Sequence, residues 1–359
     1  MKNVFYQVDS FRTHKTFEAW DQILSGGKSW HLSLFDETYN TVTWSQEPAE
    51  SFDYLINKRI QHLSNSYKKI RLWYSAGRDS HFILRELIKR NINIDEIVFV
   101  DWAYHTPVKK EKHEVLRILA NEFDNRAVPK INIFTPSRAN YSKYWQFVSK
   151  QQQSGGIGSN YGFNLNSFGT LLDLFFETPD DTCNLFGLEK PRLILKNKNV
   201  IFQMVDSSIQ HAMSPLHNIE WFFLQDVCPE LVQKQIFMLI NNVKIFAYTN
   251  NIKFNTALTL LQSDRKYYDL YCLFLGLGES VTDLTKYGGA KAFGLSNQTY
   301  HDLQLVGEVD RWDAPRYYDN FCLTAQDLIS SYRNENQKNK LPGILSLERY
   351  ICEIEEKLL

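Results

Sequence analysis

The sequence predicts an α/β protein built on a parallel β-sheet with helices on both faces. Short apolar runs of the kind that form buried strands alternate with longer stretches whose apolar residues recur at helical spacing. This alternation predicts parallel strands, because each intervening helix carries the chain back across the sheet. The expected strands are residues 70–74, 97–100 and 131–134, and the expected helices between them are residues 82–90 and 109–123.

The N-terminal part of the chain, residues 1–65, is expected to form a small α+β segment. Residues 30–35 and 41–44 flank a polar Asp-Glu-Thr-Tyr-Asn stretch, which predicts two strands around a turn. Residues 52–64 carry Leu and Ile at helical spacing and predict a helix.

The α/β domain is expected to span residues 66–215. Within it, residues 151–166 are rich in Gln, Ser, Gly and Asn, a composition typical of a loop or lid. Residues 216–359 are expected to form a mainly helical C-terminal region. Its expected elements are helices over residues 220–240, 254–275 and 345–359 and a polar linker over residues 334–340.

Composition argues against several classes of protein. The chain has 359 residues, of which 43% are hydrophobic and 14% aromatic, so most of it should fold around a sizeable core. The net charge of -1 disfavours a general nucleic-acid binder. No apolar run suits a signal peptide or a membrane-spanning helix, and the five cysteines are odd in number and far apart. We therefore expect a cytoplasmic protein with reduced thiols and no cysteine zinc site.

The most informative segment, residues 75–80, reads Ser-Ala-Gly-Arg-Asp-Ser and joins an expected strand to an expected helix. The first backbone N–H groups of a helix lack partners within it and lie at the positive end of its dipole, so phosphate oxygens can accept from them. Ser75 and Ser80 would add hydroxyl donors, and Gly77 would let the backbone approach a ligand closely. This combination predicts a phosphate-binding loop.

The two charged residues of this loop have different expected roles. Asp79 is a poor partner for phosphate, so it would cap the helix or hold Mg²⁺ against the phosphates. Arg78 could contact phosphate or extend into solvent. A serine-containing turn that only caps an ordinary helix is the alternative interpretation of the whole segment.

Residues 75–80 resemble Ser-Gly-Gly-x-Asp-Ser, the signature of the PP-loop ATP-pyrophosphatase superfamily, with Ala76 in place of the first glycine. This superfamily includes asparagine synthetase, GMP synthetase, adenylyl-sulfate reductases and tRNA-modifying enzymes. The resemblance covers residues 66–215. Within the superfamily, the chain is most similar to the C-terminal synthetase domain of asparagine synthetase. The resemblance implies a Rossmann-like sheet that binds ATP and Mg²⁺. It also implies cleavage of ATP between the α- and β-phosphates, with the loop, Ala76 and Arg78 included, holding pyrophosphate.

Two further groups of residues could complete such a site. Asp101 follows the second expected strand, where members of such families usually meet the adenine or ribose; a turn or helix-cap aspartate is the alternative. Glu189, Lys190 and Arg192 follow an apolar stretch and a glycine. Lys190 and Arg192 could neutralise phosphate charge and Glu189 could bind Mg²⁺, whereas a charged, solvent-exposed turn is the alternative.

The expected function is an ATP-dependent enzyme, of the ligase type, that cleaves ATP to AMP and pyrophosphate. It would adenylate a small-molecule or macromolecular acceptor for amide or similar bond formation. Asp79, Lys190 and Arg192 are the expected catalytic residues. Thiolating members of the superfamily use paired cysteines and deazapurine-synthesis members use a cysteine zinc cluster. The sequence shows neither arrangement, which leaves the synthetase-like branch.

Two alternatives stay open. Ala76 favours a module that binds adenine nucleotide without catalysis. A nucleic-acid-modifying enzyme would contact RNA or DNA through Arg138, Lys143, Trp145 and residues 151–166, but the neutral overall charge disfavours it. The sequence does not specify the acceptor, the nucleophile or the oligomeric state, and it gives no reason to expect a membrane partner.

Overall fold

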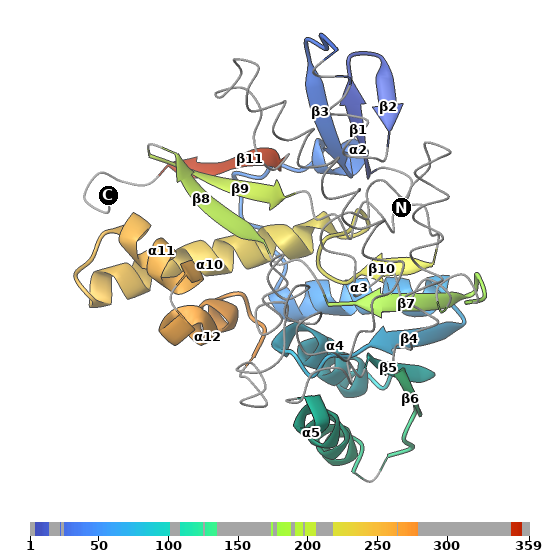
Figure 1. Cartoon of the computed structure of the whole chain (residues 1–359). Coiled ribbons are helices and arrows are strands. Elements are labelled where there is room, and N and C mark those ends of the chain that lie inside the picture. Colours follow the sequence, from blue (N-terminus) through green and yellow to red (C-terminus); the bar gives the residue numbers. More distant parts are fainter. Residues whose placement is uncertain are drawn as a thin grey trace, which may run out of the picture.

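The computed structural model describes much of the chain, and Figure 1 shows how its elements are arranged. The described residues are 4–13, 22, 25–100, 108–124, 126–134, 174, 178–187, 191–196, 198–205, 218–263, 265–278 and 346–353. The expected lid over residues 151–166 and the expected linker over residues 334–340 lie outside these ranges. Among the helices within them, none has both the length and the apolar character needed to cross a membrane.

In the part of the chain that the structure describes, the central element is a five-stranded parallel sheet with the order β10-β7-β4-β5-β6. Every neighbouring pair in it is parallel. The three strands expected from the sequence are confirmed, and so is the α/β class with a parallel sheet, an arrangement compatible with a Rossmann-like fold. The strands are β4 (Lys69–Trp73), β5 (Glu96–Val100), β6 (Lys130–Phe134), β7 (Thr182–Phe186) and β10 (Ile219–Trp221).

The order of the strands reverses in the middle of this sheet. From β4 the chain proceeds through β5 to β6 at one edge, and it then returns to β7 and β10 on the other side of β4. The connections that leave β4 and β7 therefore run in opposite directions. In open α/β sheets, ligands bind beyond the carboxyl ends of the strands at such a reversal. Residues 75–80 follow β4 directly at this point.

Helices cover one face of the sheet (Figure 1), whereas the sequence predicts helices on both faces. Apolar side chains from these helices and from the strands beneath them form one continuous core. Ser51 is the N-cap residue of the helix over residues 52–66, because its side chain accepts a hydrogen bond from the backbone N–H of Tyr54. The helices are α3 (Phe52–Ser66), α4 (Arg78–Lys89) and α5 (Val108–Glu122).

The opposite face carries a second set of buried apolar side chains, separate from that core: Trp73, Val98, Phe186, Ile219 and Trp221. The rings of Trp73 and Phe186 stack with their centroids 5.2 Å apart, and the Trp221 ring lies 5.2 Å from that of Phe186. The expectation of helices on this face falls on residues outside the described ranges.

A buried ion pair connects α3 to the edge strand β10. The Arg59 side chain is 0% exposed, and its Nη2 donates to Glu220 Oε2 at 2.8 Å and to the Trp221 carbonyl at 3.0 Å. The Tyr67 hydroxyl donates to Glu220 Oε1 at 2.7 Å. Burial raises the pKa of Glu220, but the Arg59 charge and these hydrogen bonds outweigh burial and hold that pKa below its ordinary value. Since either charge alone would be costly to bury, the pair fixes β10 against α3.

The N-terminal region differs from the expected hairpin. Its sheet has the order β2-β1-β3 and is formed by β1 (Val4–Val8), β2 (Phe11–Thr13) and β3 (Trp30–Leu34). The strand expected over residues 30–35 is confirmed, but it pairs with β1, and the strand expected over residues 41–44 is wrong. A short helix, α2 (Asp36–Tyr39), follows β3 instead. The Trp44 indole donates to the Tyr39 carbonyl at 2.9 Å and packs on the Phe202 ring. This segment is therefore a turn whose tryptophan is buried in the core.

The described residues of the C-terminal region are less helical than expected. The helices among them are α10 (Pro229–Thr249), α11 (Phe254–Ser263) and α12 (Arg265–Phe274). Residues 219–221, at the start of the first expected helix, form β10, and the helix begins only at Pro229, a residue that suits the first helical turn. The central sheet therefore takes its edge strand from beyond residue 215.

The helix expected over residues 345–359 is also wrong. Residues 346–353 form β11 (Ser346–Glu353), which pairs antiparallel with β9 (Asn199–Val205), and β9 pairs with β8 (Arg192–Lys196). This small sheet lies beside α10 in Figure 1. Ile351 is 0% exposed and belongs to the main core, so burial against the rest of the protein decides the conformation of this segment.

Candidate functional site

The loop after β4 leads directly into the first turn of α4. The helix begins at Arg78, and Gly77 is its N-cap residue, with φ of −69° and ψ of 157° and no side chain to cap the helix. Backbone N–H groups at such a helix start can donate to an anion. Asp79 lies half-buried in this first turn, where the helix dipole favours a negative charge.

Hydrogen bonds between the loop's own residues fix its shape. The Ser80 Oγ accepts from the backbone N–H of Ser75 at 3.2 Å and donates to the Gly77 carbonyl at 3.0 Å. The Ser75 Oγ accepts from the backbone N–H of Gly77 at 3.3 Å. Ser80 is buried and its hydroxyl stabilises the turn, whereas Ser75 is exposed to solvent.

Ala76 has a left-handed backbone conformation, with φ of 52°. This region favours glycine and costs an alanine about 1–2 kcal/mol. Ala76 is nonetheless 3% exposed and belongs to the main core, so burial of its methyl group offsets part of that cost. The backbone therefore turns at the position where the resembling signature has glycine.

A buried pair of side chains closes the base of the loop. The residues that flank residues 75–80 are Tyr74 and His81, and the Tyr74 hydroxyl lies 2.9 Å from His81 Nδ1. Burial, and secondarily the charge of Arg85, lowers the pKa of His81 to about 4, so the ring is neutral near pH 7. Burial together with the Glu122 carboxylate raises the pKa of Tyr74 above its ordinary value. The neutral pair links the end of β4 to the second turn of α4.

The chain that leaves β7 approaches this loop closely at Gly187. A Cβ atom at Gly187 would lie 3.0 Å from the Asp79 carbonyl carbon, 3.0 Å from the Ser80 nitrogen and 2.9 Å from Ile83 Cδ1. Only glycine fits against the first turn of α4 without displacing it. The loops that follow β4 and β7 are thus in direct contact at the strand reversal.

The Arg78 side chain is directed to the C-terminal helices. It is 4% exposed, so it does not extend into solvent. Its Nη2 donates to Asp269 Oδ1 of α12 at 2.5 Å, and its Nη1 donates to the Gly278 carbonyl at 2.6 Å. The expected contact between Arg78 and phosphate stays a prediction, and the observed partners are protein groups.

The other expected site residues are only partly covered by the described residues. Asp101, Glu189 and Lys190 lie outside them, and Arg192 is described only as the first residue of β8. Asp79 fits the expected role at Mg²⁺, since this ion usually takes one or two protein carboxylates together with substrate phosphates. Within the described ranges, no group of three or more His, Cys, Asp or Glu side chains could hold a metal by itself.

The sequence did not point to three residues near this loop. Asp269 and Gly278 hold Arg78, and the Tyr271 hydroxyl of α12 donates to the Pro191 carbonyl at 2.9 Å. Asp269 lies within an amphipathic helical pattern in which aspartate is unremarkable. No local signal could have identified it.

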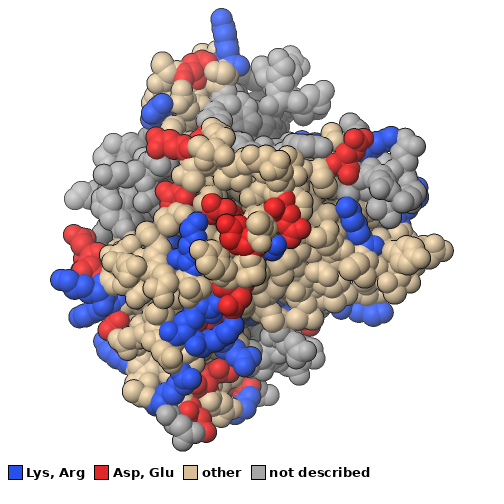
Figure 2. Space-filling model, turned by 180° about the vertical axis from the view of Figure 1, so that it is seen from behind, with Lys and Arg blue, Asp and Glu red and all other residues tan. Residues whose placement is uncertain are grey.

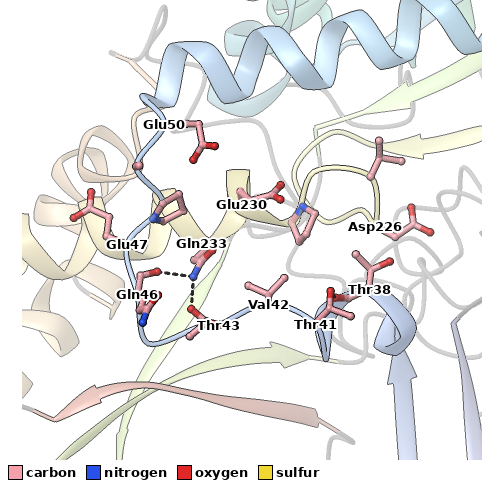
Figure 3. A pocket seen from close by; sticks show the side chains of 14 residues that line it. Thr38, Thr41, Val42, Thr43, Gln46, Glu47, Glu50, Asp226, Glu230 and Gln233 are labelled. Carbon is pink, nitrogen blue, oxygen red and sulfur yellow. Dashed lines mark hydrogen bonds between the residues drawn. The ribbon is translucent and has the colours of Figure 1, made fainter.

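A cavity of about 540 Å³ lies elsewhere, between residues 38–50 and the start of α10 (Figure 3). Gln233 lines this cavity, and its side-chain amide donates to the carbonyls of Thr43 and Gln46 at 2.7 and 2.6 Å. Four carboxylates line it: Glu47, Glu50, Asp226 and Glu230. A cavity with this lining is unsuited to the phosphates of a nucleotide, and it contains no residue of the loop after β4.

Basic and acidic side chains intermingle over the back of the molecule, with a group of acidic ones near its centre (Figure 2).

Two comparisons with known proteins found no match. No family model matches the chain, and no curated protein is similar to it at a significant level.

Proposed function

We propose that the chain binds ATP at residues 75–80 and cleaves it to AMP and pyrophosphate while adenylating an acceptor. One observation carries the proposal: a Ser-Ala-Gly-Arg-Asp-Ser loop starts a helix at the carboxyl end of β4, beside the reversal of strand order. Position and chemistry coincide there, because such a reversal is where open α/β sheets bind ligands and a helix start is where phosphates bind.

The reaction requires mainly positioning and neutralisation of charge. A carboxylate or amide oxygen of the acceptor forms a bond to the α-phosphorus, and the bond from that phosphorus to the bridging oxygen breaks, so pyrophosphate leaves with the electron pair. The backbone N–H groups around Gly77 and the hydroxyl of Ser75 would hold the pyrophosphate oxygens. The nitrogen of an amine or ammonia then forms a bond to the activated carbon of the acceptor adenylate and loses a proton. The bond from that carbon to the phosphate oxygen breaks, and AMP leaves with the electron pair.

Asp79 would hold Mg²⁺, with Glu189 as a second carboxylate. When bound, the ion supplies positive charge against the phosphate oxygens. Lys190 and Arg192 would neutralise charge on the same oxygens. In this proposal Asp101 meets the adenine or ribose.

Product identity tests the proposal. Purified full-length protein is incubated with Mg²⁺, ATP labelled at the α-phosphate and a small-molecule cell extract, and the labelled products are separated by chromatography. Wild type should give AMP. Asp79→Ala should lower the rate at least about a hundredfold, while Asp124→Ala, which removes an exposed aspartate after α5, should leave it unchanged.

Each other outcome contradicts a different part of the proposal. Labelled ADP would contradict cleavage between the α- and β-phosphates. An unchanged rate in Asp79→Ala would remove this residue from the site. Nucleotide binding without any product in extracts of several compositions would support the non-catalytic module, which Ala76 favours.

A further inference from the structure

Helix α12 contacts the chain that follows each of two neighbouring strands of the sheet, β4 and β7. The Tyr271 hydroxyl donates to the Pro191 carbonyl in the chain beyond β7, at 2.9 Å, and this bond is buried. Asp269, two residues earlier, accepts from Arg78 at the start of α4. The loop after β4 and the chain after β7 are therefore both tied to one element from the C-terminal region.

The Arg78 contacts are directional and close. Its guanidinium uses Nη2 for the Asp269 carboxylate at 2.5 Å and Nη1 for the Gly278 carbonyl at 2.6 Å. The Arg78 side chain is 4% exposed, whereas that of Asp269 is 61% exposed. A guanidinium that is almost fully buried needs a nearby carboxylate, because an uncompensated buried charge is strongly destabilising. Asp269 thus determines where the first residue of α4 can lie.

We propose that Arg78 is a positioning residue, and that its pairing with Asp269 holds residues 75–80 in the conformation that receives pyrophosphate. Arg78 is the first helical residue after Gly77, so the backbone N–H groups of the first turn move with it. The C-terminal helices, which lie far from this loop in the sequence, thereby set the geometry of the phosphate site. This inference rests on the proposed function only for the identity of the ligand.

A competing role makes the opposite prediction for one variant. If Arg78 were a phosphate ligand that Asp269 holds back in the ligand-free protein, Asp269→Ala would release it and remove a negative charge near the phosphates. Pyrophosphate would then bind more tightly. If Asp269 positions the loop through Arg78, the same substitution weakens binding even though it removes an unfavourable charge. The sign of the change separates the two roles.

Hydrogen exchange of the ligand-free, full-length protein tests the positioning role without nucleotide. Exchange at residues 75–80 should be about tenfold faster in Asp269→Ala, and at least as fast in Arg78→Ala, which also loses the bond to the Gly278 carbonyl. The double variant should exchange no faster than Arg78→Ala, because the interaction with Asp269 is already lost in that variant. Asp269→Asn retains an acceptor oxygen and should exchange at an intermediate rate. Exchange in β5 and in α10 should not change. Unchanged exchange at residues 75–80, or an equal increase throughout the protein, would overturn the proposal.

Calorimetric titration with Mg²⁺ and inorganic pyrophosphate completes the test. Asp269→Ala should bind about tenfold more weakly than wild type, and Asp269→Asn should recover part of that loss. Tighter binding in Asp269→Ala would overturn the positioning role. If wild type binds neither pyrophosphate nor ATP, the proposed function fails, and the exchange measurement still decides whether Arg78 and Asp269 fix the loop.

Discussion

Substitution of Gly187 by alanine should displace the first turn of α4. The added Cβ would lie 3.0 Å from two backbone atoms, the Asp79 carbonyl carbon and the Ser80 nitrogen, and 2.9 Å from Ile83 Cδ1. The Ile83 methyl can rotate away, but the backbone atoms can retreat only if the turn moves. Favourable contacts between non-bonded carbon atoms lie at about 3.5–4.0 Å, so a shift of about 0.5 Å is required.

The expected magnitude follows from this geometry. Gly187 does not have a positive φ, so the substitution adds steric overlap without backbone strain, and overpacking of this kind costs about 1–3 kcal/mol of unfolding free energy. The same shift moves the Ser80 N–H and the Asp79 carboxylate relative to a bound phosphate. Because site geometry is sensitive on this scale, Mg-ATP should bind about tenfold more weakly.

A matched glycine variant separates loss of stability from loss of site geometry. Gly26 has φ of 106°, and nothing lies within 4 Å of an added Cβ, so Gly26→Ala should lower stability through backbone strain, away from the loop after β4. Urea denaturation would measure stability, and fluorescence titration with Mg-ATP would measure affinity. If Gly187→Ala binds Mg-ATP as well as Gly26→Ala at a similar loss of stability, the contact between the two loops does not position the phosphate site.

Two further predictions concern Ala76 in the loop and His81, which flanks it. Ala76→Gly should change the unfolding free energy by less than about 1 kcal/mol in urea denaturation. The substitution relieves the positive φ, but it also removes the methyl contacts and gives the unfolded chain the greater freedom of glycine. An increase in unfolding free energy above about 2 kcal/mol would mean that the strain at Ala76 is not compensated. His81 has a folded-state pKa of about 4, below its unfolded value. Its contribution to the free energy of unfolding is therefore complete above about pH 6.5 and is lost as the pH falls. Wild type should therefore lose about 2 kcal/mol more than His81→Gln between about pH 7 and about pH 5. Equal losses in the two proteins would show that His81 titrates in the folded protein as it does in the unfolded chain.

Three of the five strands of the central sheet, β4, β5 and β6, could be predicted because local sequence patterns determine them. Apolar runs flanked by helical patterns have one compact solution, and the order of elements along the chain fixes their parallel direction. The wrong predictions fall where distant contacts decide. The segment over residues 346–353 has Leu347, Tyr350 and Ile351 at helical spacing, yet it completes an antiparallel sheet beside β9. Likewise, β10 depends on the pairing of Glu220 with Arg59 from α3, which no local pattern contains.

The same distinction divides the candidate site. Residues 75–80 are consecutive, so one segment of sequence displays their serines, glycine and aspartate together. Gly187 and Asp269 act on that segment from other parts of the chain, and Asp269 lies 191 residues beyond Arg78. A position that varies in the resembling signature is one that the phosphate-binding chemistry leaves open. Its residue type can therefore follow whatever element packs against the loop in a given protein. In this chain the element is α12, whose Asp269 accepts a hydrogen bond from Arg78, and our proposal assigns Arg78 its role through this contact.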